Sequence, residues 1–184
     1  WSHHHSNIKF RELLTLNSKE INICINGVKE CHDIKEIVVL STCNRIEFYA
    51  ISDNVDSLLQ YIYNLYKNHL NRRINFDISQ PKILYNQIAI QHLCKVAAGM
   101  DSMVLWEKQI LNQVQDVLTI LLKDDSQFYR LIILFKNAIL CGKNIRKKIN
   151  IDNHQGSISF LATTVVKQHY PKIQNHPILI IGAG

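Results

Sequence analysis

The sequence predicts an α+β fold, in which a small antiparallel sheet packs with helices and a second α/β unit begins near the end of the chain. Two apolar segments, 37–40 and 46–51, flank a short polar connection, a pattern typical of two strands joined by a turn. Apolar residues recur at helical spacing in several other stretches up to residue 149. Sequential strands combined with separate helices are typical of the α+β class.

The first half of the chain predicts short helices and strands, each bounded by capping or turn residues. In order they are a short helix after Ser6 or Asn7, a helix over 17–28, the strands around 37–40 and 46–51, a helix beginning at Asp53 or Asp56, and, over 71–76, a turn followed by a short edge-like strand segment. The short first helix carries Ile8, Leu13 and Leu14 as its apolar residues. Together these elements predict the sheet-containing layer of the fold.

The second half is predicted to be mainly helical, with helices over 85–98, about 104–123, 126–149 and 157–169. Gly99 is a natural stop for the first of these helices, and Asp101 and Ser102 are typical cap residues for the second. The chain ends in Pro177–Gly184, where four apolar residues lead into Gly-x-Gly. A dinucleotide-binding Rossmann unit begins in this way.

The composition of the chain is typical of a globular protein that does not associate with a membrane. The 184 residues are enough for one domain and part of a second, and 47% hydrophobic and 20% charged residues are globular values. No apolar run approaches the ~20 residues that cross a bilayer, so no membrane association is expected. The five cysteines are an odd, widely spaced set without a C-x-x-C pair, which favours reduced thiols in the cytoplasm. The net charge of +6 suits a nucleic-acid partner without requiring one.

Cys43 lies in the polar connection Ser-Thr-Cys-Asn-Arg between the two strands. Such a turn holds a thiol among rigid neighbours and leaves it accessible, and the positive charge of Arg45 favours the thiolate. Thr42 and Asn44 can donate hydrogen bonds to a substrate carbonyl or carboxylate. The residues alone leave two interpretations open, a cysteine nucleophile and a cysteine that happens to lie in a turn.

Four basic residues, Lys143, Arg146, Lys147 and Lys148, crowd the end of the helix predicted over 126–149. Basic side chains at a helix C-terminus complement the helix dipole. They could equally contact the phosphates of an RNA. The sequence does not decide between these two roles.

Two motifs resemble those of the glutamyl-tRNA reductase family. The first is Leu40-Ser-Thr-Cys-Asn-Arg-Ile-Glu-Phe-Tyr49, and the second runs from His92-Leu93 through Asp101-Ser102 and Glu107 to Gln113. The resemblance covers nearly the whole chain. It implies a catalytic domain over residues 1–152, followed over 153–184 by a linker and the truncated beginning of an NADP-binding Rossmann domain.

The resemblance also implies roles for individual residues. Cys43 matches the nucleophile, and His92 either donates a proton to the leaving ribose oxygen or orders the site. Arg45 can bind the side-chain carboxylate of glutamate, and Glu107 can face its α-ammonium group. The residues expected to bind the substrate are Thr42, Asn44, Arg45, Ser102, Glu107, Lys108, Gln109 and Gln113; those expected to bind NADPH are Gly182, Ala183 and Gly184; no metal is expected.

The implied reaction converts glutamyl-tRNA(Glu) into glutamate-1-semialdehyde, the first step of tetrapyrrole (porphyrin) biosynthesis by the glutamate route. The Cys43 thiolate attacks the glutamyl ester, and NADPH then reduces the resulting thioester. The implied partners are the tRNA, a second copy of the full-length chain as a homodimer, and the glutamate-1-semialdehyde aminomutase, which could receive the product by channelling. Because most of the NADPH domain is missing from the sequence, an alternative is a truncated or drifted module that binds or hydrolyses glutamyl-tRNA without completing the reduction.

Three positions depart from the family pattern. The family usually has Gly-Glu-Pro-Gln-Ile and then Gly-Gln, whereas this chain has Trp106, Lys108 and Asn112 in place of the glycine, the proline and the second glycine. If the backbone at Trp106 has a positive φ, a tryptophan there is strained. The departures therefore bear on the geometry of the Glu107 side of the site.

Overall fold

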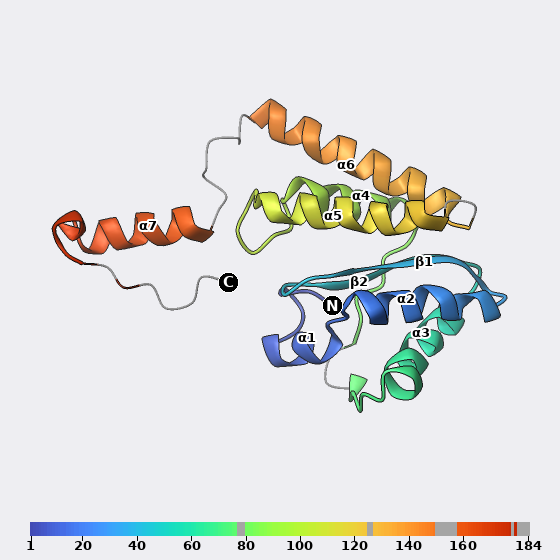
Figure 1. Cartoon of the computed structure of the whole chain (residues 1–184). Coiled ribbons are helices and arrows are strands. Elements are labelled where there is room, and N and C mark those ends of the chain that lie inside the picture. Colours follow the sequence, from blue (N-terminus) through green and yellow to red (C-terminus); the bar gives the residue numbers. More distant parts are fainter. Residues whose placement is uncertain (77–79, 125–126, 150–157, 178, 180–184) are drawn as a thin grey trace.

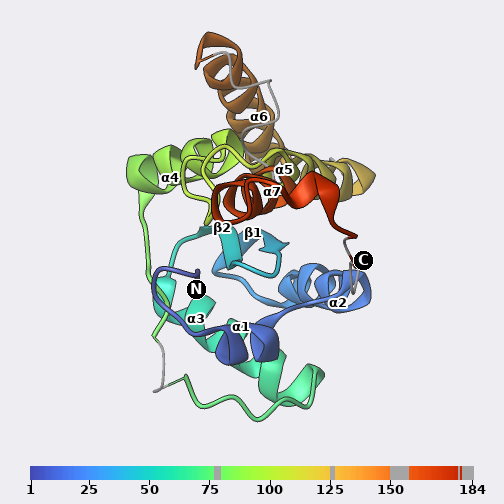
Figure 2. The same ribbon diagram turned by 90° about the vertical axis from the view of Figure 1, so that its left-hand side faces the viewer.

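The computed structural model describes residues 1–76, 80–124, 127–149, 158–177 and 179, and it shows an α+β fold whose sheet lies between two groups of helices (Figure 1). The sheet consists of two antiparallel strands, β1 (Ile34–Ser41) and β2 (Ile46–Ser52). On one side lie α1 (Ile8–Leu14), α2 (Ser18–Gly27) and α3 (Val55–Asn64), and on the other α4 (Asn86–Ala98), α5 (Lys108–Leu121) and α6 (Tyr129–Ile149). Figure 2 shows the same arrangement from the side. Shorter helical turns span Val28–Glu30, Leu65–His69, Leu122–Asp124 and Ile173–Asn175.

Strand β1 is buried on both faces because helices cover both sides of the sheet. Residues 37–40 are at most 1% exposed, which explains why this strand is a continuous apolar run and not an alternating one. The register pairs Leu40 with Glu47 and Ser41 with Ile46, so residues 42–45 form the connecting turn. The predicted strand–turn–strand is therefore confirmed.

Asparagine side chains cap the first three helices. Asn7 accepts a hydrogen bond from the Phe10 amide at 2.8 Å, and Asn17 forms a capping box with Glu20. The cap of α3 is Asn54, so the prediction of Asp53 or Asp56 at this position was wrong by one or two residues. The side-chain amide oxygen of asparagine offers the same acceptor as an aspartate.

Of the turn and short edge-like strand predicted over 71–76, the strand prediction is wrong, because no strand of the described chain includes these residues. Asn71 has φ 50°, and Phe76 is held by aromatic packing, with its ring centroid 4.3 Å from Tyr63 and 5.6 Å from Trp1. The backbone neighbour of β2 is instead the first segment of the chain, where Ser2 pairs with Arg45. In α1 only Leu14 of the three predicted apolar residues is buried, whereas Ile8 and Leu13 face solvent.

Helices α5 and α6 begin later than their sequence patterns predict. The backbone at Trp106 has φ 68°, which no α-helix allows, so α5 begins at Lys108 and not near residue 104. Helix α6 begins at Tyr129, where the buried Glu36 carboxylate of β1 accepts hydrogen bonds from the Arg130 and Leu131 amides at 3.2 and 2.8 Å. A buried carboxylate from the sheet thus caps this helix.

The C-terminal prediction is met only in part by the described residues. Helix α7 (Ile158–His169) matches the helix predicted over 157–169 and stands apart from the other layers in Figure 1. The predicted domain boundary at 152/153 and the glycine turn lie outside the described residues, and so does the strand before it apart from Pro177 and Leu179. Among the described helices, none has the length and apolar character needed to cross a membrane.

Candidate functional site

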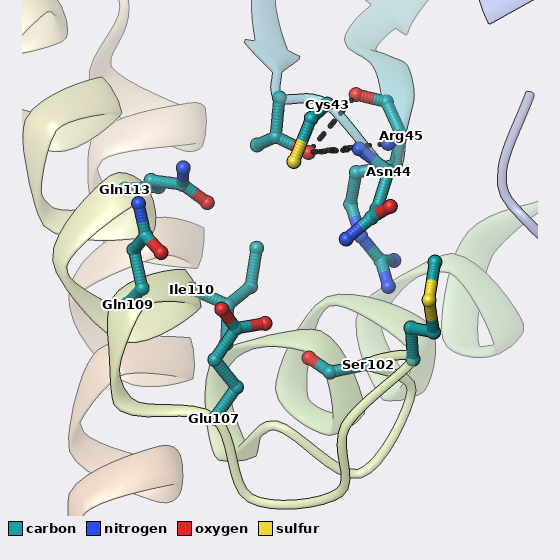
Figure 3. A pocket seen from close by; sticks show the side chains of 10 residues that line it. Cys43, Asn44, Arg45, Ser102, Glu107, Gln109, Ile110 and Gln113 are labelled. Carbon is teal, nitrogen blue, oxygen red and sulfur yellow. Dashed lines mark hydrogen bonds between the residues drawn. The ribbon is translucent and has the colours of Figure 1, made fainter. Parts of the chain in front are cut away.

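A hollow lies between the β1–β2 turn and the beginning of α5. The turn contributes Cys43 from above, and α5 presents Gln109, Ile110 and Gln113 opposite it (Figure 3). The loop between α4 and α5 closes the hollow from below with Ser102, Met103 and Glu107. Residues more than 55 positions apart in the sequence therefore meet around the Cys43 thiol.

The turn that carries Cys43 is rigid, and the thiol itself is exposed. The Thr42 hydroxyl accepts hydrogen bonds from the amides of Asn44 and Arg45 at 3.2 and 3.1 Å, while the Thr42 amide donates to the Arg45 carbonyl oxygen at 2.8 Å. Arg11 of α1 donates from Nε to the Cys43 carbonyl oxygen at 3.4 Å. Thr42 is 7% exposed, and its hydroxyl group stabilises the turn. The hydroxyl group that was predicted to bind substrate is therefore already hydrogen-bonded to the two backbone amides of the turn.

Arg45 is buried in a cluster of carboxylates. Its Nη1 donates to Glu47 at 2.8 Å and to Asp101 at 3.0 Å, and its Nη2 donates to the Asp101 carbonyl oxygen. The side chain lines the hollow but is only 1% exposed. Two carboxylates thus already compensate the charge of Arg45. Asp101 binds this guanidinium and is not the helix cap that the sequence suggested, because α5 begins at Lys108.

Glu47 is the centre of this cluster. Its Oε1 lies 2.9 Å from His92 Nε2, and its Oε2 accepts a hydrogen bond from the Tyr49 hydroxyl at 2.6 Å. Burial alone would raise the pKa of Glu47, but the hydrogen bond with His92 and the charge of Arg45 outweigh burial and lower the pKa to about 2. Burial and the Glu47 carboxylate raise the pKa of Tyr49 well above its ordinary value.

Three of these side chains could in principle surround a metal ion. The donor atoms of Glu47, His92 and Asp101 lie within 4.8 Å of one another. The Nη1 atom of Arg45 contacts two of the three, so a guanidinium already supplies the positive charge that a metal would bring.

The loop before α5 has an unusual backbone. Gly99 ends α4 with φ 81°, as predicted, and Trp106 has φ 68°. The Trp106 amide donates to the Gly99 carbonyl oxygen at 2.8 Å, and a Cβ at position 99 would lie only 3.0 Å from the Trp106 Cα. The sequence-based expectation of strain at Trp106 is therefore met, because this is the left-handed region that glycine tolerates and tryptophan does not.

The structure brings together most of the predicted site residues. Those that line the hollow are Thr42, Cys43, Asn44, Arg45, Ser102, Glu107, Gln109 and Gln113. Lys108 is exposed and is not among the lining residues, and His92 faces Glu47 and not the thiol. Of the two roles that the resemblance implied for His92, this position favours ordering the site. Gly182, Ala183 and Gly184 lie outside the described residues.

Sequence reasoning missed several residues of the site. Met103 and Ile110 line the hollow, while Glu47, Tyr49 and Asp101 hold Arg45 and His92 in place. One signal was available for Glu47: it lies two residues after Arg45, at the beginning of a predicted strand, and residues two apart in extended backbone point to the same face. No local pattern could have indicated Asp101, because its partner lies 56 positions away.

Comparison with known proteins agrees with the resemblance that the two sequence motifs indicate. The family model described as "Glutamyl-tRNAGlu reductase, N-terminal domain" matches residues 1–149. The chain belongs to the glutamyl-tRNA reductase family. Glutamyl-tRNA reductases of Desulfitobacterium hafniense and Pelotomaculum thermopropionicum are 33% and 34% identical to it over its full length. The chain spans 41% of each of these two relatives.

The fold of this glutamyl-tRNA reductase family member also matches a solved structure. The glutamyl-tRNA reductase from Methanopyrus kandleri superposes with a TM-score of 0.68 over 91% of this chain and 38% of that one. At 22% identity this likeness concerns the fold alone. The family assignment therefore rests on the sequence matches, and the arrangement of helices around the sheet agrees with it.

Proposed function

We propose that this chain carries the acyl-transfer chemistry of a glutamyl-tRNA reductase. The Cys43 thiol gives up its proton to solvent, the thiolate attacks the ester carbonyl of glutamyl-tRNA(Glu), the C–O bond to the terminal ribose breaks, and the ribose oxygen takes a proton from solvent as the tRNA leaves. The observation that carries this proposal is the exposed Cys43 thiol, held in a rigid turn opposite polar side chains of α5 in a chain of this family.

The lining residues suit a bound glutamyl group. Glu107 supplies a carboxylate for the α-ammonium group, and the amides of Asn44, Gln109 and Gln113 supply neutral donors for the side-chain carboxylate. The role of Arg45 in binding that carboxylate remains a prediction, since Glu47 and Asp101 hold the guanidinium. His92 acts by holding Glu47, through which it orders Arg45 and the turn.

Reduction of the thioester to glutamate-1-semialdehyde, the first step of tetrapyrrole synthesis, needs a hydride donor. The family resemblance implies NADPH, and the residues expected to bind it lie outside the described ones. A cytoplasmic location, a homodimer and transfer of the product to the aminomutase remain predictions of the same resemblance.

A trapping experiment tests the proposal. The chain is incubated with radiolabelled glutamyl-tRNA and quenched in acid, and label on the protein is tested for release by hydroxylamine, which cleaves thioesters. Wild type and the control Cys31→Ser, which alters a half-buried thiol away from the hollow, should both take up label, whereas Cys43→Ser should not. Equal label in Cys43→Ser, or none in wild type that binds the tRNA, would contradict the proposal.

A second candidate is a module that binds or hydrolyses glutamyl-tRNA without reducing it. The strained backbone at Trp106, beside Glu107, is the observation that favours it. A thioester without a hydride donor is lost to water, so this candidate predicts glutamate as the product with or without NADPH. Semialdehyde that forms only with NADPH, detected by mass spectrometry, would exclude it.

A further inference from the structure

Arg146 is a buried arginine on a basic helix end. Exposed lysines surround it near the end of α6, yet Arg146 itself is only 5% exposed. Its Nη1 and Nη2 donate to the Trp106 carbonyl oxygen at 2.7 and 2.8 Å, and Nη2 also donates to the Glu107 carbonyl oxygen. Because its guanidinium is bound to the protein's own backbone, neither of the two roles suggested by the sequence describes this residue.

The close packing of α6 against α4 brings Arg146 to this turn. A Cβ at Gly142 would lie 2.7 Å from the Ala97 carbonyl oxygen, so the two helix backbones touch at this point. Arg146 follows Gly142 by one helical turn, and the loop to which it binds follows the end of α4. The distance from α6 to the loop is thus fixed by a backbone contact and not by flexible side chains.

The turn at residues 106–107 needs such a partner. Trp106 has a left-handed backbone conformation, and Glu107, the N-cap of α5, makes no side-chain capping bond. The two successive carbonyl groups therefore take their fixed orientation from one planar guanidinium, whose donors point in set directions. Glu107 then directs its side chain into the hollow that Cys43 lines.

We propose that Arg146 is a positioning residue for the candidate site. It fixes the Trp106–Glu107 turn, so that Glu107 and the first turn of α5 face the thiol, although Arg146 itself does not line the hollow. The effect on catalysis rests on the proposed function, whereas the effect on the turn does not. The two effects are therefore measured separately.

The first experiment needs no substrate. Trp1→Phe leaves Trp106 as the sole tryptophan of the chain, and acrylamide quenching of its fluorescence then reports on the turn. Arg146→Lys keeps the charge and loses the planar fork, so the quenching constant should rise about twofold or more, while the control Lys136→Ala, at an exposed position of the same helix, should leave it unchanged. Unchanged quenching in a folded Arg146→Lys chain would overturn the proposal. Arg146→Gln is the second variant if the lysine variant does not fold.

The second experiment measures single-turnover acylation by glutamyl-tRNA. Arg146→Lys should lower the rate at saturating tRNA by about tenfold or more, because misplaced groups slow a reaction strongly, and should change the half-saturating concentration by less than about twofold. Lys136→Ala should leave the saturated rate unchanged. A saturated rate in Arg146→Lys equal to that of wild type would overturn the role in catalysis. If wild type itself is not acylated, the proposed function fails, and the fluorescence result still decides whether Arg146 holds the turn.

Discussion

Three non-glycine residues in the described chain have a positive φ, and Trp106 is the one that is not an asparagine. Asparagine tolerates the left-handed region, whereas a residue with a bulky side chain pays about 1–2 kcal/mol there. Trp106→Gly removes this cost but adds freedom to the unfolded chain, so its free energy of unfolding should be about 1 kcal/mol higher than that of a glycine variant at a neighbouring position without strain, measured by urea denaturation. Lost contacts of the half-buried indole reduce this difference, which is why the lower value is expected.

Leu105→Gly is the matched control for this prediction. Leu105 lies in the same loop, is 59% exposed and has no positive φ, so a glycine there only adds freedom to the unfolded chain. It should lower the free energy of unfolding by a few tenths of a kcal/mol up to about 1 kcal/mol. If both glycine variants were destabilised alike, strain at Trp106 would be refuted.

Glu47 makes stability depend on pH in the acid range. Its pKa is lowered from the ordinary 4.5 to about 2 in the folded chain, so the folded state gains stability above the ordinary value and loses it as the pH falls from about 4.5 towards 2. The groups that face it are Arg45 of the β1–β2 turn, Tyr49 of β2, His92 of α4 and, through Arg45, Asp101. The contribution is on the order of a few kcal/mol.

The variant Glu47→Gln isolates this contribution. It should be less stable than wild type at pH 7, and its free energy of unfolding should fall less between pH 7 and pH 3, because glutamine does not titrate. Glu12→Gln, at an exposed position of α1, should show the same fall as wild type. Urea denaturation at several pH values measures all three, and parallel curves for Glu47→Gln and wild type would contradict the assignment.

At the scale of elements, the contact between α4 and α6 depends on Gly142. Alanine normally stabilises a helix interior by about 1 kcal/mol relative to glycine. Here its Cβ would lie 2.7 Å from the Ala97 carbonyl oxygen, so the helices must separate. Gly142→Ala should therefore lower the free energy of unfolding by about 1–3 kcal/mol.

Whether Gly142→Ala lowers or raises the free energy of unfolding tests this prediction. Asn144→Ala, at an exposed position two residues further along α6, gains helix propensity without a clash and should be neutral or slightly stabilising. Thermal unfolding of the two variants compares them directly. A Gly142→Ala chain as stable as Asn144→Ala would show that the helices can adjust at no cost.

The sequence could predict those elements whose stabilising contacts are local, and not those that depend on distant segments of the chain. The strands, their turn and the bodies of the helices depend on local apolar spacing and caps, so β1, β2, α2 and α4 emerge close to their expected bounds. The start of α5 depends on the backbone at Trp106, and the course of 71–76 depends on aromatic contacts with Trp1 and Tyr63. Contacts between distant segments leave no periodic trace in the sequence.

The candidate site shows the same division. Cys43 and the residues facing it could be predicted from two motifs, because the chemistry requires those side chains and the motifs contain them. The buried arginines could not be assigned from motifs: Arg45, expected to bind substrate, is held by two carboxylates, and Arg146, expected at the surface, holds two carbonyl groups. Their partners are decided by the packing of α4 and α6 against the sheet.

At the scale of the whole molecule, the hollow lies where the turn of the sheet meets the group of helices formed by α4, α5 and α6. Cys43 comes from the sheet, while Glu107 and Gln113 come from the helical side. Glu36 and Arg45 also join these two parts, one by capping α6 and the other by binding Asp101. The position of the thiol relative to α5 is thus set by charged groups buried at the junction, and any substrate of Cys43 must approach this junction.

A group of exposed basic side chains lies close to this junction. Lys143, Lys147 and Lys148 are exposed on the helix end whose Arg146 binds the Glu107 turn. If they contact tRNA phosphates, changing all three to alanine should weaken tRNA binding and lower the slope of log K against log salt by up to about 3, roughly one for each lost contact. Changing the exposed Lys19, Lys67 and Lys123 to alanine is the control for this prediction. It removes the same charge elsewhere and should leave the slope nearly unchanged.

Filter binding at several salt concentrations measures both variants. Equal slopes for the two would assign the effect to net charge alone and would leave the α6 lysines the simpler task of complementing the helix dipole.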